Sequence, residues 1–110
     1  MNEQISPFKA LDFIRDNANK YAQAKANVTY MTEYRKSLKA ILMTECEAET
    51  QSAKETYAYK HPDYVTHLVG LKDAVAEAER LRWLMVAAEA RIEVWRSLES
   101  SARAEGRSTT

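Results

Sequence analysis

The chain has two histidines, His61 and His67, a residue type that suggests metal binding or acid–base chemistry. Helical metal sites usually place two histidines four positions apart, whereas these are six apart with Pro62 between them. The sequence places no third ligand near them. We therefore interpret His61 as a turn residue and His67 as a surface residue, and we predict neither a metal nor a cofactor.

Paired carboxylates are the next candidates for acid–base chemistry. Glu77 with Glu79, and Glu89 with Glu93, alternate with arginines along one stretch. Charged residues three or four apart on a helix usually form solvated pairs worth about 0.2–0.5 kcal/mol. We interpret these glutamates as surface charges rather than catalytic groups.

Nucleophilic and phosphate-binding motifs give no stronger signal. The single cysteine, Cys46, cannot form a disulfide within the chain and lies among glutamates, whereas an activated cysteine needs positively charged surroundings. With two glycines, the chain has no Gly-rich phosphate loop, and GxSxG and CxxC motifs are absent. We therefore predict that the protein is not an enzyme.

Basic and aromatic residues are interleaved in two stretches, a pattern typical of both nucleic-acid-binding and protein-binding surfaces. Sixteen basic and sixteen acidic residues cancel, and the glutamates between the arginines would repel a phosphate backbone. This balance favours a protein partner over single-stranded nucleic acid. The residues predicted to contact nucleic acid or a partner are Lys36, Arg80, Arg82, Arg91 and Arg96.

The stretch from Leu81 to Trp95 carries more apolar residues than one packed helix face requires. One stripe has the spacing of a packing face and contains Leu81, Leu84, Met85, Ala88, Ile92 and Trp95. A second stripe, predicted to lie beside it, contains Trp83, Val86, Ala87, Ala90 and Val94. A chain of 110 residues is too small to cover both stripes by itself, so we expect the second stripe to be an oligomer or partner interface.

The elements that position these residues are predicted to be long helices, because two glycines and two prolines leave few turn signals. Ser6 and Pro7 form a helix start, and Asp16–Asn19 favour a break, with one long bent helix as the alternative. Ser52–Glu55 fit a capping box, and Pro62 begins or kinks the last helix. The predicted helices span residues 7–15, 18–50, 53–60 and 62–104.

We expect one all-α domain over residues 1–110, a long antiparallel helical hairpin with a short N-terminal helix, in an oligomer. Gly70 interrupts the last helix and predicts a close helix approach there. The sequence has no run of 18 apolar residues, so we predict no membrane span. The first residues lack the basic region and apolar core of a signal peptide, so we expect a cytoplasmic protein.

Four stretches of the chain resemble a family of small uncharacterised helical proteins of tailed bacteriophages and prophages. The similarity covers most of the chain and is most recognisable at Ile92–Arg96. It implies a bacterial host cell and genes that lie near recombination genes, and it supplies no catalytic or binding residues. The stretches are Tyr30–Arg35 (YMTEYR), Lys36–Leu42 (KSLKAIL), Tyr59–Tyr64 (YKHPDY) and Glu79–Arg96 (ERLRWLMVAAEARIEVWR).

Three functions are compatible with these observations. The first is a phage accessory protein that oligomerises and binds a phage or host protein, with DNA recombination as the context. The alternative is an inhibitor of a host defence or host enzyme. The third is direct binding of single-stranded nucleic acid, which predicts an affinity that falls steeply with added salt.

Overall fold

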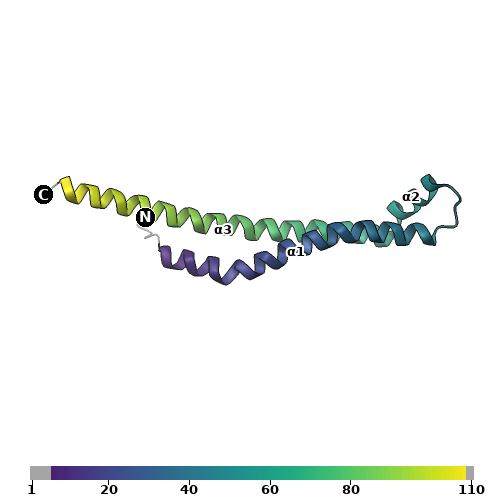
Figure 1. The fold of residues 1–110 in the computed structure, drawn as a ribbon, viewed down its shortest axis with the longest axis horizontal. Coiled ribbons are helices and arrows are strands. Elements are labelled where there is room, and N and C mark those ends of the chain that lie inside the picture. The colour runs from purple at the N-terminus through teal and green to yellow at the C-terminus, as the bar shows by residue number, and fades with distance from the viewer. Residues whose placement is uncertain (1–5, 109–110) are drawn as a thin grey trace. The chain divides into compact units, whose positions relative to one another are not determined.

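The computed structural model of the protein describes residues 6–108, which form three α-helices and no strand. In chain order they are α1 (Pro7–Glu45), α2 (Gln51–Lys60) and α3 (Pro62–Ser108) (Figure 1). The prediction of an all-α fold is confirmed. None of these helices has a stretch apolar enough, over the length required, to cross a membrane.

The first helix begins where the sequence indicates and does not break at Asp16–Asn19. The Ser6 hydroxyl accepts a hydrogen bond from the backbone N–H of Lys9 at 3.3 Å, which caps α1 ahead of Pro7. The predicted separate helices over residues 7–15 and 18–50 are wrong, because α1 is continuous through this segment. Asn17 does not cap a helix end there, since its side-chain amide donates to the carbonyl of Phe13 at 2.8 Å within the helix.

The connection between α1 and α2 also differs from the prediction. The first helix ends at Glu45 rather than at residue 50, with no basic residue in its last turn to favour the helix dipole. The N-cap of α2 is Thr50, whose side chain accepts from Ala53 N–H at 3.2 Å. The helix therefore starts two residues before the predicted 53, and Thr50 takes the capping role that Ser52 was expected to fill.

The junction between α2 and α3 follows from one proline. His61 is extended, with φ −63° and ψ 136°, as expected for a residue that precedes proline. Pro62 is the first residue of α3, where its missing N–H costs no hydrogen bond. The helix then continues to Ser108, four residues beyond the predicted end at 104.

The chain divides into two compact units, and both long helices run through both of them. One unit contains Ala22–Glu79, and we call it the hairpin unit. The other contains Met1–Tyr21 and Arg80–Thr110, of which residues 6–21 and 80–108 are described, and we call it the terminal unit.

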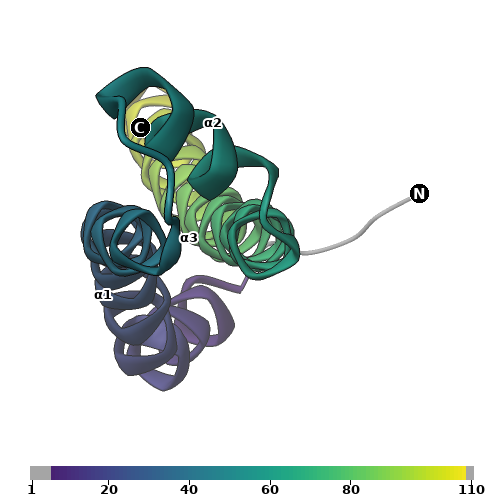
Figure 2. The ribbon, with the colours of Figure 1, turned by 90° about the vertical axis from the view of Figure 1, so that its right-hand side faces the viewer.

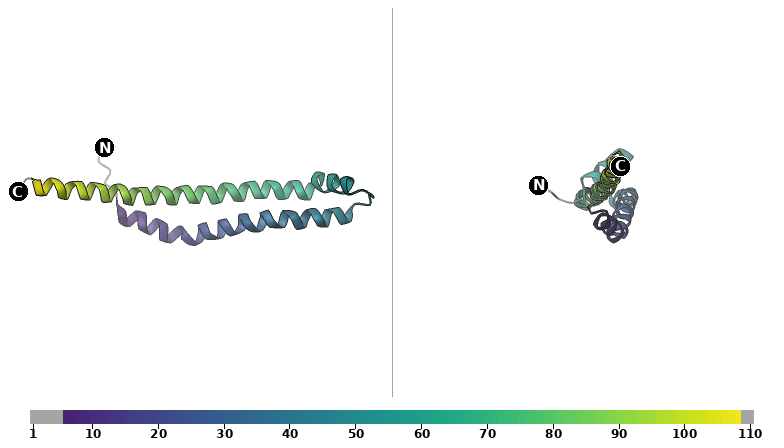
Figure 3. Two further views of the ribbon diagram at one scale, coloured as in Figure 1. Left: turned by 45° about the horizontal axis from the view of Figure 1, so that its top comes forward. Right: turned by 90° about the vertical axis from the view of Figure 1, so that its left-hand side faces the viewer.

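In the hairpin unit, α1 and α3 lie side by side and antiparallel, and α2 packs on them next to the connection (Figures 2 and 3). Met31 lies against His67 and Gly70, whereas Leu38 and Leu42, further along α1, lie near Tyr64, which comes earlier in α3. All three helices share one core, in which Leu42 is 2% exposed. Its members are Leu38, Leu42, Ala58 and Tyr64, with Met43 packed against them.

A side chain of the facing helix lies close to Gly70, in line with the close helix approach that the sequence predicts. A Cβ added at this position would lie 3.0 Å from the terminal methyl of Met31. The neighbour is the flexible end of a side chain from α1. Glycine therefore leaves room for a side chain of the facing helix.

The terminal unit pairs the start of α1 with the C-terminal part of α3 and has a thin core. Its buried residues are small apart from one leucine: Pro7, Ala10, Leu81 and Ala88. Small side chains let two helices approach closely but bury little apolar area. The large apolar residues of this unit therefore stay mostly at its surface, and the candidate site is built from them.

Candidate functional site

The α3 helix of the terminal unit is apolar on two opposite sides. Leu81 and Ala88 are 4% and 6% exposed and face the core. Ala90 lies nine residues after Leu81, which is about two and a half turns and places it on the far side of the helix. The second apolar stripe was predicted to lie beside the first, and that placement is wrong, because the stripe is centred half a turn away.

We call this far side the outer face, and all five of its members are exposed. Trp83 is 58% exposed, Val94 47% and Val86 39%. The guanidinium carbon of Arg82 lies 4.9 Å from the Trp83 ring centroid, a cation–π contact that leaves most of the indole in solvent. The outer face consists of Trp83, Val86, Ala87, Ala90 and Val94.

A groove of about 270 Å³ lies between the first turns of α1 and the first half of the α3 segment in the terminal unit. Its floor is apolar, and two basic residues, Lys9 and Arg91, complete its lining. We call it the terminal groove. Its residues are Lys9, Ala10 and Phe13 of α1, and Leu84, Ala87, Ala88 and Arg91 of α3.

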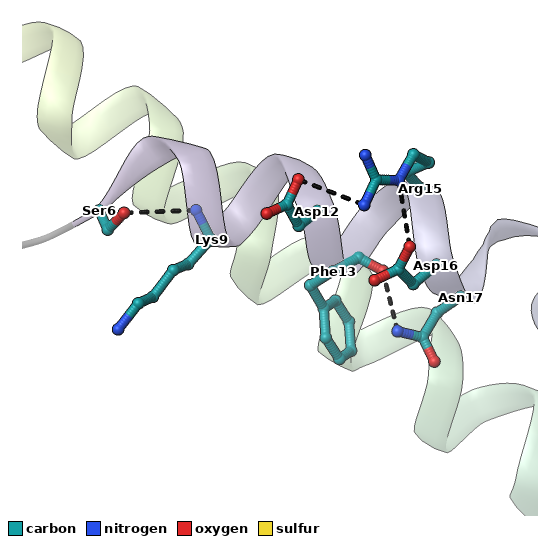
Figure 4. A network of polar contacts seen from close by, with 7 residues as sticks. All are labelled: Ser6, Lys9, Asp12, Phe13, Arg15, Asp16 and Asn17. Atoms are coloured by element: carbon teal, nitrogen blue, oxygen red, sulfur yellow. Dashed lines mark hydrogen bonds and ion pairs between the residues drawn. The ribbon is translucent and has the colours of Figure 1, made fainter.

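The two basic residues of the groove form no ion pair with any described residue. Asp12, the acidic residue one turn after Lys9, pairs instead with Arg15 at 3.5 Å. Arg15 also contacts Asp16 at 3.1 Å, and these carboxylates keep its pKa raised, chiefly through the Asp16 hydrogen bond. Figure 4 shows the Lys9 side chain extending away from Asp12, on the side of the helix from which Phe13 projects. The Lys9 ammonium is thus left without a carboxylate.

Arg91 lacks a partner for a reason that is visible in the sequence. The positions three and four residues away on a helix are those within reach of its side chain. For Arg91 they are all apolar: Ala87, Ala88, Val94 and Trp95. A sequence reading could have found this unpaired arginine, whereas Lys9 and Phe13 were missed because nothing in the sequence shows that they lie beside it.

The other arginines predicted to contact a partner are engaged within the protein. Arg96 contacts Glu93 at 3.2 Å, and Arg82 lies over Trp83. Arg80 is exposed and also has an interaction within the protein. Of the four predicted arginines, Arg91 alone lines the terminal groove.

Lys36 belongs to the hairpin unit and lines a different, more polar hollow of about 320 Å³. Lys36 contacts Glu33 at 3.2 Å, and Lys39 contacts Glu55 at 3.7 Å and lies 4.8 Å from the Tyr59 ring centroid. A hydrogen bond with Tyr59, aided by Glu55, raises the pKa of Lys39. The hollow is lined by Arg35, Lys36, Lys39, Tyr59 and Tyr64.

The two histidines make different contacts. His67 was expected at the surface, but it is partly buried, with Nε2 2.7 Å from the carbonyl oxygen of Met31 and its ring 5.5 Å from that of Tyr34. His61 Nδ1 accepts from the backbone N–H of Asp63 at 3.0 Å at the turn before α3. Among residues 6–108, no three His, Cys, Asp or Glu side chains gather in a way that could hold a metal ion.

Comparison with known proteins adds no relative to this picture. No protein-family model, curated protein or solved structure matches the chain.

Proposed function

We propose that the protein is a non-enzymatic accessory protein that self-associates through the outer face of α3 and binds a protein partner. The exposure of Trp83 carries this proposal. Tryptophan is the residue most enriched at the centres of protein interfaces, and this one is 58% exposed with Val86 and Val94 on the same face. An apolar face of this kind, opposite the packed face of the same helix, favours burial against another molecule.

The spacing of the outer face favours a second copy of the chain as the occupant. Trp83, Ala87, Ala90 and Val94 follow one another at intervals of four, three and four, the repeat of a coiled-coil seam. In a two-fold antiparallel pair, Trp83 would pack on Val94 of the partner subunit, and Ala87 on Ala90 of the partner subunit. Each end of the seam then has one large and one medium side chain, with small residues between.

The biological setting of this proposal comes from the similarity to phage and prophage proteins. On that resemblance, we propose that the protein acts in the cytoplasm of a bacterial host, as an accessory to a recombination protein. Inhibition of a host defence or host enzyme is the alternative that the same exposed face would serve. Affinity capture from infected and uninfected cells distinguishes them, since a phage recombination protein supports the first role and a host nuclease supports the second.

The mass of the protein in solution across a dilution series tests self-association. We expect a dimer or larger species that Trp83→Ala converts to monomer without loss of helix content by circular dichroism. Tyr30→Ala is the matched control, because Tyr30 is similarly exposed, at 65%, but lies in the hairpin unit. A wild-type monomer at micromolar concentration, or equal loss of assembly in both variants, would reject the proposal.

A second candidate, nucleic-acid binding, is favoured by the basic hollow of the hairpin unit. Arg35, Lys36 and Lys39 line it together with two tyrosine rings, a combination suited to phosphate and base contacts. Acidic residues nevertheless outnumber basic ones in the hairpin unit, and Glu33 and Glu55 already contact Lys36 and Lys39. Titration of a labelled single-stranded oligonucleotide at low salt tests this candidate, which requires an affinity that Lys36→Gln weakens.

A further inference from the structure

The terminal groove combines an apolar floor with two unpaired cations. Phe13 and Leu84 contribute the large apolar side chains, and Leu84 is 41% exposed although it faces the groove. No acidic residue lines this groove. The groove thus presents apolar surface and positive charge together. It lacks a carboxylate of the kind that pairs with Arg15 and with Arg96 elsewhere in this unit.

We propose that the terminal groove binds an acidic peptide segment of another protein, in which one large apolar side chain is flanked by carboxylates. The apolar side chain would lie against Phe13 and Leu84, and the carboxylates would contact the Lys9 ammonium and the Arg91 guanidinium. This inference rests on the proposed role in protein binding and names the chemistry of the partner.

Charge complementarity selects this occupant. An arginine guanidinium can bind a carboxylate through two parallel hydrogen bonds, and such pairs are strongest where apolar surface excludes water. The residues three and four positions from Arg91 are all apolar, and the nearby Glu93 contacts Arg96 instead. A purely apolar segment would leave both cations unpaired, and a purely acidic one would leave Phe13 and Leu84 in contact with water.

The size of the groove also fits a side chain rather than a whole domain. A hollow of about 270 Å³ is close to the lower end of the range for small-ligand sites. One aromatic or leucine side chain would fit inside it, while the rest of the segment lies along the open rim. The groove is therefore suited to bind a short sequence motif rather than a large protein surface.

The groove adjoins the outer face of α3, because Ala87 belongs to both. Peptide binding and self-association are nevertheless separable, since Lys9 and Phe13 are not part of the outer face and Trp83 does not line the groove. A variant of one surface can therefore be tested for its effect on the other.

Fluorescence anisotropy with labelled synthetic peptides and the whole 110-residue chain tests this inference. The probe is an acidic peptide with a central Phe, and its controls replace that Phe by Ala or all carboxylates by amides. We expect binding of the probe, little binding of either control, and an affinity that falls with added salt. Arg91→Gln and Lys9→Gln should each weaken binding by about fivefold.

Arg96→Gln is the matched control, because it removes the same charge from an exposed arginine of the same helix that already contacts Glu93. Equal weakening by Arg91→Gln and Arg96→Gln, or equal affinity for the probe and its Phe-to-Ala control, would overturn the inference. Displacement by a single-stranded oligonucleotide but not by unlabelled acidic peptide would also overturn it. Light scattering on the same samples reports self-association separately, so failure of peptide binding is distinguishable from failure of the proposed assembly.

Discussion

The imidazole Nε2 of His67 on α3 lies 2.7 Å from the main-chain carbonyl oxygen of Met31 on α1. Thirty-six residues separate the two along the chain, so this contact fixes the register of the two helices in the hairpin unit. A carbonyl oxygen only accepts hydrogen bonds, so Nε2 carries the proton and donates it. The carbonyl of Met31 in turn gains a partner in addition to its own helix.

Replacement of His67 by Ala should destabilise the protein by about 1–2 kcal/mol, because a partly buried hydrogen bond and the ring contact with Tyr34 are both lost. Urea unfolding followed by circular dichroism measures the change. Lys72→Ala, an exposed position on the same helix, is the control and should change stability by less than about 0.5 kcal/mol. Equal effects of the two variants would mean that the His67 contact contributes nothing.

Gly70→Ala should stabilise the protein, but by less than the roughly 1 kcal/mol that alanine usually gains over glycine in a helix. The added methyl would lie 3.0 Å from the terminal methyl of Met31, which must swing aside. A double-mutant cycle with Met31→Ala separates the two contributions. We expect the larger gain from Gly70→Ala when Met31 is already replaced, and identical gains in both backgrounds would show that the two residues do not interact.

Local signals in the sequence predicted the helix boundaries best. Ser6 acts through a hydrogen bond to its own first helical turn, and Pro62 acts through the backbone geometry that it imposes on His61; both helix starts occur where expected. The expected break at Asp16–Asn19 failed because the same polar groups that cap helices also bond within them, as Asn17 does with Phe13. Thr50 was overlooked as a cap because Ser52 and Glu55 matched a known motif two residues later.

The candidate site was only half predictable for a different reason. The residues of the outer face follow from periodicity within one helix, and the unpaired Arg91 follows from its apolar neighbours. The terminal groove needs Phe13 and Lys9 beside Leu84, a pairing of segments about seventy residues apart that no local pattern encodes. Register between helices comes from packing, and packing depends on both partners at once.

The cluster of Lys39, Tyr59 and Glu55 predicts a specific dependence on alkaline pH. The hydrogen bond with Tyr59, and then Glu55, raise the pKa of Lys39 above its ordinary value of 10.5. Because the folded-state pKa is the higher one, the stabilisation is fully present below pH 10.5 and is lost as the pH rises through the folded-state pKa. Tyr59→Phe should therefore lower the unfolding temperature at neutral pH, and the difference from wild type should shrink above pH 10.5. A difference that stays constant across this range would exclude the Lys39 contribution.

Replacement by Ala should affect a different property at each of the two tryptophans of α3. Trp95 is partly buried, so Trp95→Ala should destabilise the protein by about 2–3 kcal/mol, at or below the lower end for a fully buried aromatic side chain. Trp83 is 58% exposed and contacts Arg82, so Trp83→Ala should leave the unfolding free energy of the single chain nearly unchanged and weaken self-association.

Concentration separates these two effects. If the outer face is buried between copies, the unfolding temperature of the wild type rises with protein concentration, because assembly stabilises the folded chain by mass action. That concentration dependence should persist in Trp95→Ala and vanish in Trp83→Ala. Differential scanning calorimetry over a hundredfold dilution measures both variants on the same scale. Loss of the dependence in Trp95→Ala alone would place the interface on the opposite side of α3, where Leu81 and Ala88 lie, and would reverse the assignment of the two faces.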